Sequence, residues 1–173
     1  EYFPALEAAF DAATREICLE TYIFEDDPTG RRIAQALMRA ARRGVAIHVL
    51  LDGFGSKDLS EDLLQDLGNC GVRVLKYRPD ISPWTLRRER LRRMHRKIVV
   101  VDARVAFVGG INVIDDMHTP RQTPPRFDYA VRIEGPLLAD IYPVVTRLWT
   151  LVMWTQLHQR WHSPATSIEA ARC

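Results

Sequence analysis

Apolar residues recur with two different periods along the first half of the chain. Helical spacing, with apolar residues three or four positions apart, occurs in residues 4–14, 26–44 and 60–71. Shorter segments that favour strands fill residues 15–24, 45–53 and 72–77. The middle one of these is mostly apolar, as expected for a strand that is covered on both faces of its sheet. This order of strands and helices predicts an α/β fold.

The pattern changes in the second half of the chain. Residues 98–102 and 105–110 are two strand-like segments, and the two residues between them, Ala103 and Arg104, predict a hairpin turn. A further strand is expected at 128–133. The chain therefore contains strands that follow one another without a helix between them, in addition to the alternating strands and helices of its first half.

Residues 135–161 have the pattern of one long helix. Pro143 lies inside it and indicates either a kink or a break between two helices. Trp149, Trp154 and Trp161 stand in this segment among aliphatic residues. We expect the helix to pack across the sheet. The alternative is that part of its wide apolar surface covers another half of the protein or contacts lipid.

Composition limits the class of protein without identifying a partner. The 173 residues are enough for one domain with a sizeable core. An apolar content of 47% and a charged content of 27% are usual for a soluble domain, and a net charge of +2 is too small to indicate a partner. The three cysteines form no CxxC pair, which favours reduced thiols. No apolar run approaches the roughly 18 residues that span a bilayer, so a membrane role would be peripheral or depend on other segments.

The segment 94–112, MHRKIVVVDARVAFVGGIN, contains the candidate chemistry. In a strand, His95 and Lys97 project from the same face, so an imidazole and an ammonium converge on one place. The next strand ends in two glycines, where a substrate can approach the backbone, and the amide of Asn112 follows directly. Such an arrangement suits a tetrahedral anion, most simply a phosphate ester. The full pattern, H-x-K-x4-D-x6-G-G-x-N, comprises His95, Lys97, Asp102, Gly109, Gly110 and Asn112.

This pattern resembles the HKD motif of the phospholipase D superfamily. Beyond the motif, the segments ETYIFEDDPTG, AARRGVAIHVLLDGFGS and DYAVRIEGP resemble the amino-terminal half of bacterial cardiolipin synthases of the B type. The resemblance implies an α/β fold with a mixed β-sheet between helices. It also implies a single domain over residues 1–173 that carries one motif and forms one half of a two-motif enzyme.

The resemblance implies a role for each motif residue. His95 would attack phosphorus and form a covalent phosphohistidine, while Lys97 and Asn112 hold the non-bridging oxygens. Asp128 would accept a hydrogen bond from Nδ1 of His95 and leave Nε2 free to attack. Asp102 is expected to be structural. A second motif histidine, absent here, would protonate the leaving alcohol, and no metal or other cofactor is needed.

Substrate contacts are expected from the glycines and from a basic segment. Gly109 and Gly110 would line the substrate site. The run RRERLRR, residues 87–93, immediately precedes the motif, and its Arg92 and Arg93 are candidates for binding the headgroup. The alternative is a solvated basic loop. For Glu20, which lies in the predicted strand 15–24, two interpretations stay open: it lines the site, or it is a satisfied polar group.

The implied activity is that of a phosphatidyltransferase of the cardiolipin synthase type. It would move a phosphatidyl group from a phosphatidylglycerol-like lipid to the hydroxyl of another lipid, in the bacterial cytoplasm and peripheral to the inner membrane. Its partner would be a second half in the same chain or in a homodimer. Two alternatives remain: a dimeric hydrolytic phosphodiesterase or nuclease of the same superfamily, and a non-catalytic half-domain that binds lipid or phosphate.

Overall fold

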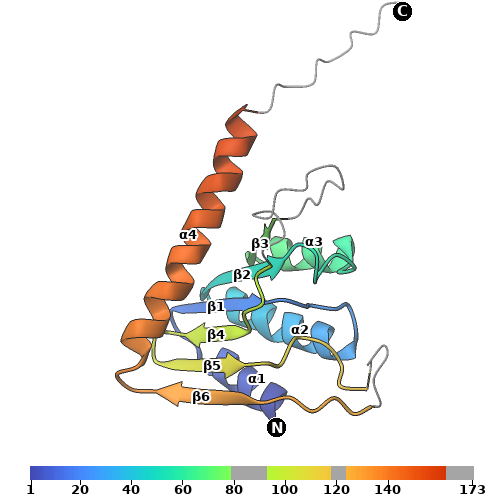
Figure 1. Ribbon diagram of the computed structural model, residues 1–173, viewed down its shortest axis with the longest axis vertical. Coiled ribbons are helices and arrows are strands. Elements are labelled where there is room, and N and C mark those ends of the chain that lie inside the picture. The colour runs from blue at the N-terminus through green and yellow to red at the C-terminus, as the bar shows by residue number, and fades with distance from the viewer. Residues whose placement is uncertain (79–92, 118–123, 163–173) are drawn as a thin grey trace, which may run out of the picture.

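The strands form one mixed β-sheet, and helices cover both of its faces (Figure 1). The computed structural model describes residues 1–78, 93–117 and 124–162, without the side chains of 159–162. The helices are α1 (Tyr2–Ala12), α2 (Pro28–Arg42), α3 (Glu61–Asn69) and α4 (Leu138–His162). The strands are β1 (Glu16–Thr21), β2 (Ala46–Asp52), β3 (Arg73–Tyr77), β4 (Ile98–Val101), β5 (Val105–Gly109) and β6 (Ala130–Glu134). The predicted fold class is confirmed.

The sheet joins a parallel half to an antiparallel half. Its strand order is β3-β2-β1-β4-β5-β6. The strands β1, β2 and β3 are parallel, because each is connected to the next through a helix. Antiparallel pairing begins between β1 and β4 and continues through β5 to β6. The central strand β1 therefore lies directly beside β4, whose leading segment carries the motif histidine and lysine.

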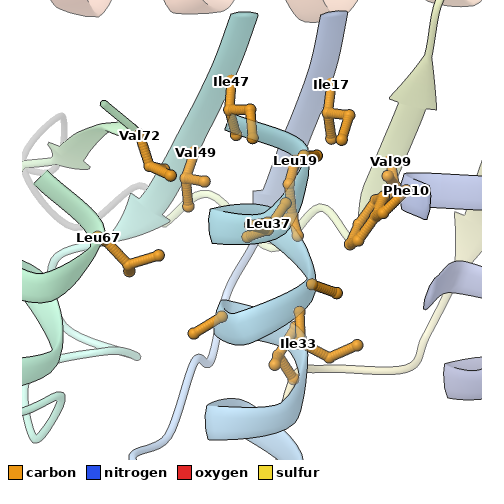
Figure 2. Packing of buried hydrophobic residues seen from close by; sticks show 14 of the residues in the cluster. Phe10, Ile17, Leu19, Ile33, Leu37, Ile47, Val49, Leu67, Val72 and Val99 are labelled. Atoms are coloured by element: carbon orange, nitrogen blue, oxygen red, sulfur yellow. The ribbon is translucent and has the colours of Figure 1, made fainter. Parts of the chain in front are cut away.

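Alternate residues of the strands serve two separate cores. On one face, Ile17 and Leu19 of β1 pack against α1 and α2, and Val49 of β2 joins the same cluster. Figure 2 shows Ile33 and Leu37 of α2 lying against these strand residues. The intervening residue Cys18 of β1 faces the other side of the sheet. Two-sided burial explains why β4, with the sequence IVVV, is apolar throughout.

The helix α4 covers the second face. It is one helix with Pro143 inside it, not two helices. Val145, Trp149 and Val152 are buried against the sheet, which confirms the expected packing of this helix. Trp154, in contrast, is 63% exposed. Within the described residues, no helix combines the length and the apolar character that a bilayer crossing requires.

The turn of the β4–β5 hairpin contains the predicted Ala103 and Arg104 but begins one residue earlier, at Asp102. Its two central residues are Asp102 and Ala103, with φ of 53° and 54°, and Arg104 N donates to Val101 O at 2.9 Å. Positive φ at both central positions matches the right-handed twist of the flanking strands. The carboxylate of Asp102 also accepts hydrogen bonds from the start of β1, so this residue leaves the β4 ladder.

Candidate active site

The segment Met94–Lys97 is held at both ends. It directly precedes β4, which begins at Ile98, the residue at which the sequence predicted the strand to begin. Met94 N donates to the carboxylate of Asp52 at 2.8 Å, and the Met94 side chain is buried. At the other end, the carbonyl of Lys97 accepts a hydrogen bond from Gly109 N at 3.2 Å. These contacts fix the backbone that carries the candidate nucleophile.

The structure brings His95 and Lys97 together. Nζ of Lys97 lies 3.0 Å from Nε2 of His95. His95 is exposed, whereas Lys97 is only 6% exposed. Burial lowers the pKa of Lys97, and the charge of Asp128 offsets part of this effect. The ammonium group of Lys97 and the exposed imidazole of His95 together form a suitable pair for binding an anionic group.

Tyr22 is a site residue that the sequence analysis missed. Its ring centroid lies 5.0 Å from that of His95, and Nζ of Lys97 is 5.4 Å from the same ring. It follows directly after β1, and β1 pairs with β4. The available signal was the position of the tyrosine at the carboxyl end of a central strand, where ligand sites of α/β sheets form.

The two glycines of the motif allow a close approach of the chain. A Cβ atom at Gly110 would collide with the carboxylate of Asp128, and one at Gly109 would collide with Tyr129 and Ala130. The glycines were expected to make room for a substrate. In this structure they make room for the entry of β6, and they thereby place Asp128 beside the end of β5.

Asn112 is oriented by the backbone of the segment that follows β1. Its Oδ1 accepts a hydrogen bond from Ile23 N at 3.0 Å, and the residue is 9% exposed. With the oxygen engaged in this way, the NH₂ group of the side chain remains to donate. That orientation suits the expected contact with a phosphoryl oxygen.

Asp128 lies near Lys97 but forms no hydrogen bond with His95 among the described residues. Its Oδ1 accepts a hydrogen bond from Tyr129 N at 2.8 Å. In the part of the chain that the structure describes, no hydrogen bond connects Asp128 with His95. The expected orienting contact to Nδ1 therefore stays a prediction, while the electrostatic influence of Asp128 on Lys97 indicates that it is close.

The basic residues before the motif are only partly described. The guanidinium of Arg93 lies 4.8 Å from the ring centroid of Phe54, as a cation–π contact. Arg92 and the rest of the run from residue 87 lie outside the described residues. The headgroup-binding role of Arg92 and Arg93 stays a prediction.

Asp102 lies at the opposite end of β4 from His95. Its carboxylate accepts hydrogen bonds from the backbone N–H groups of Thr14, Arg15 and Glu16 and from the Thr14 hydroxyl, at 2.8–2.9 Å. Burial alone raises the pKa of Asp102, but these hydrogen bonds outweigh it and the pKa is lowered. The carboxylate thus ties the start of β1 to the hairpin.

Glu20 is buried at the other end of β1, on the side of the motif. It is 2% exposed, and neither of its oxygens has a hydrogen-bond partner among the described residues. Oε2 lies 3.6 Å from Nη1 of Arg96. Of the two interpretations, the satisfied polar group does not fit these contacts.

One group of side chains could hold a metal ion by distance alone. Ligand atoms of Glu16, Cys18 and His48 all lie within 4.8 Å of one another. Burial raises the pKa of Cys18 to about 12, and a hydrogen bond with Glu16 raises that of Tyr142 to about 12. A neutral thiol and a carboxylate that already has a donor favour a packed polar cluster over a metal centre.

A hollow of about 620 Å³ adjoins the site. Asn112 and Asp128 are among its lining residues, together with Phe127 and Tyr129. Both of these aromatic side chains are 85% exposed. The hollow therefore joins polar groups of the candidate site to an exposed aromatic surface.

Comparison with known proteins identifies relatives of this chain. The family model described as "Cardiolipin synthase, PLD-like domain" matches residues 6–141. Cardiolipin synthase B of Escherichia coli (strain K12) is 44% identical over 141 residues, which make up 82% of this chain and 34% of that protein. The chain thus spans about a third of the length of the curated relatives it matches.

Two solved structures have a similar fold. Nuc from Salmonella typhimurium, a phospholipase D family member, matches with a TM-score of 0.61 and 22% identity, over 88% of this chain and 86% of that one. NucT from Helicobacter pylori matches with a TM-score of 0.62 and 15% identity, over 87% of this chain and 86% of that one. At these identities, the similarity concerns the fold alone.

Proposed function

Since this chain belongs to the family of phospholipase D-like domains of cardiolipin synthases, we propose that it is the catalytic half-domain of a phosphatidyltransferase. Nε2 of His95 attacks the phosphorus of a phosphatidylglycerol-like lipid, and the bond from phosphorus to the headgroup oxygen breaks. The headgroup leaves as glycerol, and the phosphatidyl group stays on the imidazole. The observation that carries the proposal is the contact of 3.0 Å between His95 and Lys97.

The second half of the reaction regenerates the histidine. The hydroxyl of a second lipid attacks phosphorus, the bond between nitrogen and phosphorus breaks, and its electron pair returns to Nε2. The proton of that hydroxyl leaves through the acid–base group that earlier protonated the glycerol oxygen. This group comes from a second motif, in the same protein or in a homodimer partner, because the chain has no second H-x-K-x4-D pattern.

Lys97 and Asn112 stabilise the transition state. Nζ of Lys97 faces Nε2 of His95, and a phosphoryl oxygen that enters between them takes over the ammonium as its donor. The NH₂ group of Asn112 donates to another oxygen, since its own oxygen is held by Ile23 N. Donors that are fixed in advance stabilise the charge that develops on these oxygens. Neither a metal ion nor another cofactor is part of this proposal.

Exposed apolar residues suit a lipid substrate and a second half-domain. Phe127 and Tyr129 flank Asp128 beside the hollow and are placed to meet acyl chains or a membrane surface. On α4, Leu151 and Trp154 are more than half exposed, and the part of this chain that matches cardiolipin synthase B makes up only 34% of that relative. We assign the α4 surface to contact with the remainder of the protein, and the aromatic surface to peripheral contact with the bacterial inner membrane.

Product analysis of the full-length protein tests the proposal. Vesicles of phosphatidylglycerol are expected to yield cardiolipin and glycerol, and single-stranded DNA is expected to remain intact. A labelled phosphatidyl adduct should be trapped on His95 and be absent from His95→Gln, while His158→Gln, an exposed histidine of α4, retains it. Cleavage of the DNA instead of lipid transfer would establish the phosphodiesterase alternative, and the lack of any adduct would establish a non-catalytic half-domain.

A further inference from the structure

Glu20 is a buried acid that the proposed chemistry does not use. It belongs to β1, and its register partners are Leu50 of β2 and Ile98 of β4. Both partners are apolar and belong to the hydrophobic clusters between the sheet and α4. At 2% exposure, and without a hydrogen bond to either oxygen in the described residues, this carboxyl group is costly to bury in its ionised form.

The cation that faces Glu20 is Arg96. Nη1 of Arg96 lies 3.6 Å from Oε2, which is within reach of an ion pair but too long for a hydrogen bond. From β1 itself, the Cys18 thiol interacts with Glu20 electrostatically. The nearest acid of β2, Asp52, is already bonded to the backbone N–H groups of Phe54, Gly55 and Met94. Arg96 is therefore the charged partner of Glu20 in the described part of the chain.

Arg96 stands between the two residues of the catalytic pair. In extended backbone, neighbouring side chains project to opposite sides, so Arg96 points toward Glu20 while His95 and Lys97 point together to the other side. Met94 projects to the same side of the segment as Arg96. It is buried with Leu50 and Trp149 in the hydrophobic cluster between the sheet and α4. The segment is thus anchored to the sheet through Met94 and Arg96, and its reactive residues are presented on the opposite side.

We propose that Glu20 is a positioning residue, whose ionised carboxylate holds Arg96 and thereby orients the segment that carries His95 and Lys97. This inference rests on the roles that are proposed above for those two residues. Burial raises the pKa of Glu20 to about 7, although the charge of Arg96 acts in the opposite direction. The anchor consequently forms above neutral pH and is lost below it, which makes the transfer rate sensitive to pH through a group outside the reaction centre.

The effect of Glu20 ionisation on the transfer rate can be isolated in the full-length protein. The rate of wild type is divided by the rate of Glu20→Gln at each pH. Gln keeps the size of the side chain and mimics the protonated acid, so titrations that both proteins share cancel in the ratio. We expect a ratio near one below about pH 6, rising around pH 7 to roughly ten- to a hundredfold above about pH 8. A ratio that is independent of pH overturns the proposal.

Two further variants separate positioning from a general loss of structure. In an Arg96→Gln background, the Glu20→Gln substitution should have no additional effect on rate, because the two residues act as one pair. Glu61→Gln, which removes an exposed acid paired with Lys76 at 4.0 Å, should keep the wild-type dependence of the rate on pH.

Glu20→Gln should also unfold no earlier than wild type at pH 8, so a lower rate together with retained stability supports positioning. Additive rate effects of Glu20→Gln and Arg96→Gln overturn it.

A spectroscopic measurement keeps the inference separate from the proposed activity. The ¹³C-methyl resonance of Met94, which adjoins the anchor, should shift with a midpoint near pH 7 in wild type and not in Glu20→Gln. If wild type transfers no phosphatidyl group but this titration is present, the proposed function fails and the coupling of Glu20 to the segment stands. If the resonance of Met94 does not respond to pH, the coupling itself is refuted.

Discussion

Nζ of Lys97 lies 3.0 Å from Nε2 of His95, so the side-chain amine of Lys97 and this ring nitrogen meet in one place. An ammonium group has donors only, so it contacts Nε2 through an N–H group when that ring nitrogen carries no proton. The lone pair of Nε2 faces the place where an anion would meet Lys97. A nucleophile and a cation thus share one position before any substrate arrives.

Lys97→Met tests the contribution of this ammonium. The rate of phosphatidyl transfer is expected to fall by about 10²–10³-fold, because one preorganised donor to the charged transition state is lost. Stability should not fall, since burial lowers the pKa of Lys97 and methionine removes the cost of burying a charge. Steady-state rates and urea denaturation measure the two effects. Lys57→Met, at a mostly exposed lysine, is the matched control, and an unchanged rate in Lys97→Met contradicts the assigned role.

Gly110→Ala tests the placement of Asp128. The added methyl group collides with the Asp128 carboxylate and displaces it, so the transfer rate should fall tenfold or more if this acid orients His95, by analogy with other orienting partners (~10–100-fold). Crowding should also cost about 1–3 kcal/mol of stability. Gly68→Ala is the control, because its Cβ meets nothing within 4 Å inside α3 and should stabilise the protein by about 0.5–1 kcal/mol. A Gly110→Ala protein with the full transfer rate would show that the position of Asp128 is irrelevant.

Asp102→Asn tests the structural role of the motif aspartate. Asparagine retains one acceptor oxygen for the N–H groups at the start of β1, so a loss of about 2–3 kcal/mol of unfolding free energy is expected at neutral pH. The pKa of Asp102 is lowered in the folded state, so its contribution is present above the unfolded value of about 3.9 and disappears as the pH falls through the folded value. Denaturation at several pH values should show the difference between the two proteins shrinking in acid. A difference that persists in acid would point to packing instead of charge.

Glu20→Gln should alter stability in the opposite direction. The pKa of Glu20 is raised from 4.5 to about 7 in the folded state. The stability that its protonated form contributes is therefore complete below about pH 4.5 and lost as the pH rises through about 7. Because the variant cannot ionise, it should exceed wild type by up to about 3 kcal/mol above pH 7 and lose this advantage in acid. Urea denaturation near pH 5 and pH 8 measures this, and parallel pH dependences of the two proteins would contradict the buried charge.

The sequence was informative where the chemistry and the periodicity are local. The positions of the β4 and β5 segments followed from apolar runs with a short connection, and α2 followed from helical spacing that ends near Gly44. The pattern from His95 to Asn112 likewise identified the motif, because its spacing can be counted along the chain. The turn begins one residue earlier than predicted, at Asp102, since its carboxylate is engaged by Thr14 and Glu16, which lie far away in sequence.

Other features arise only from pairing between distant segments. Glu20 meets Arg96 because β1 lies antiparallel to β4, and Tyr22 meets His95 at the end of that same pairing. No period or spacing along the chain encodes which strands become neighbours. Similarly, the closeness of Gly110 to Asp128 depends on β6 adding to the edge of β5.

By itself, the sequence determined the α/β fold class, the motif pattern and the strand that follows His95 and Lys97, because each follows from residue type and short-range periodicity. The tertiary structure alone decided the surroundings of those residues: the ring of Tyr22 beside His95, the acid of Glu20 behind Arg96 and the carboxylate of Asp128 against Gly110. The physical reason is that burial and electrostatic environment are properties of neighbours in space. These neighbours are set by strand order and register, which bring together residues that lie far apart in the chain, such as Glu20 and Arg96.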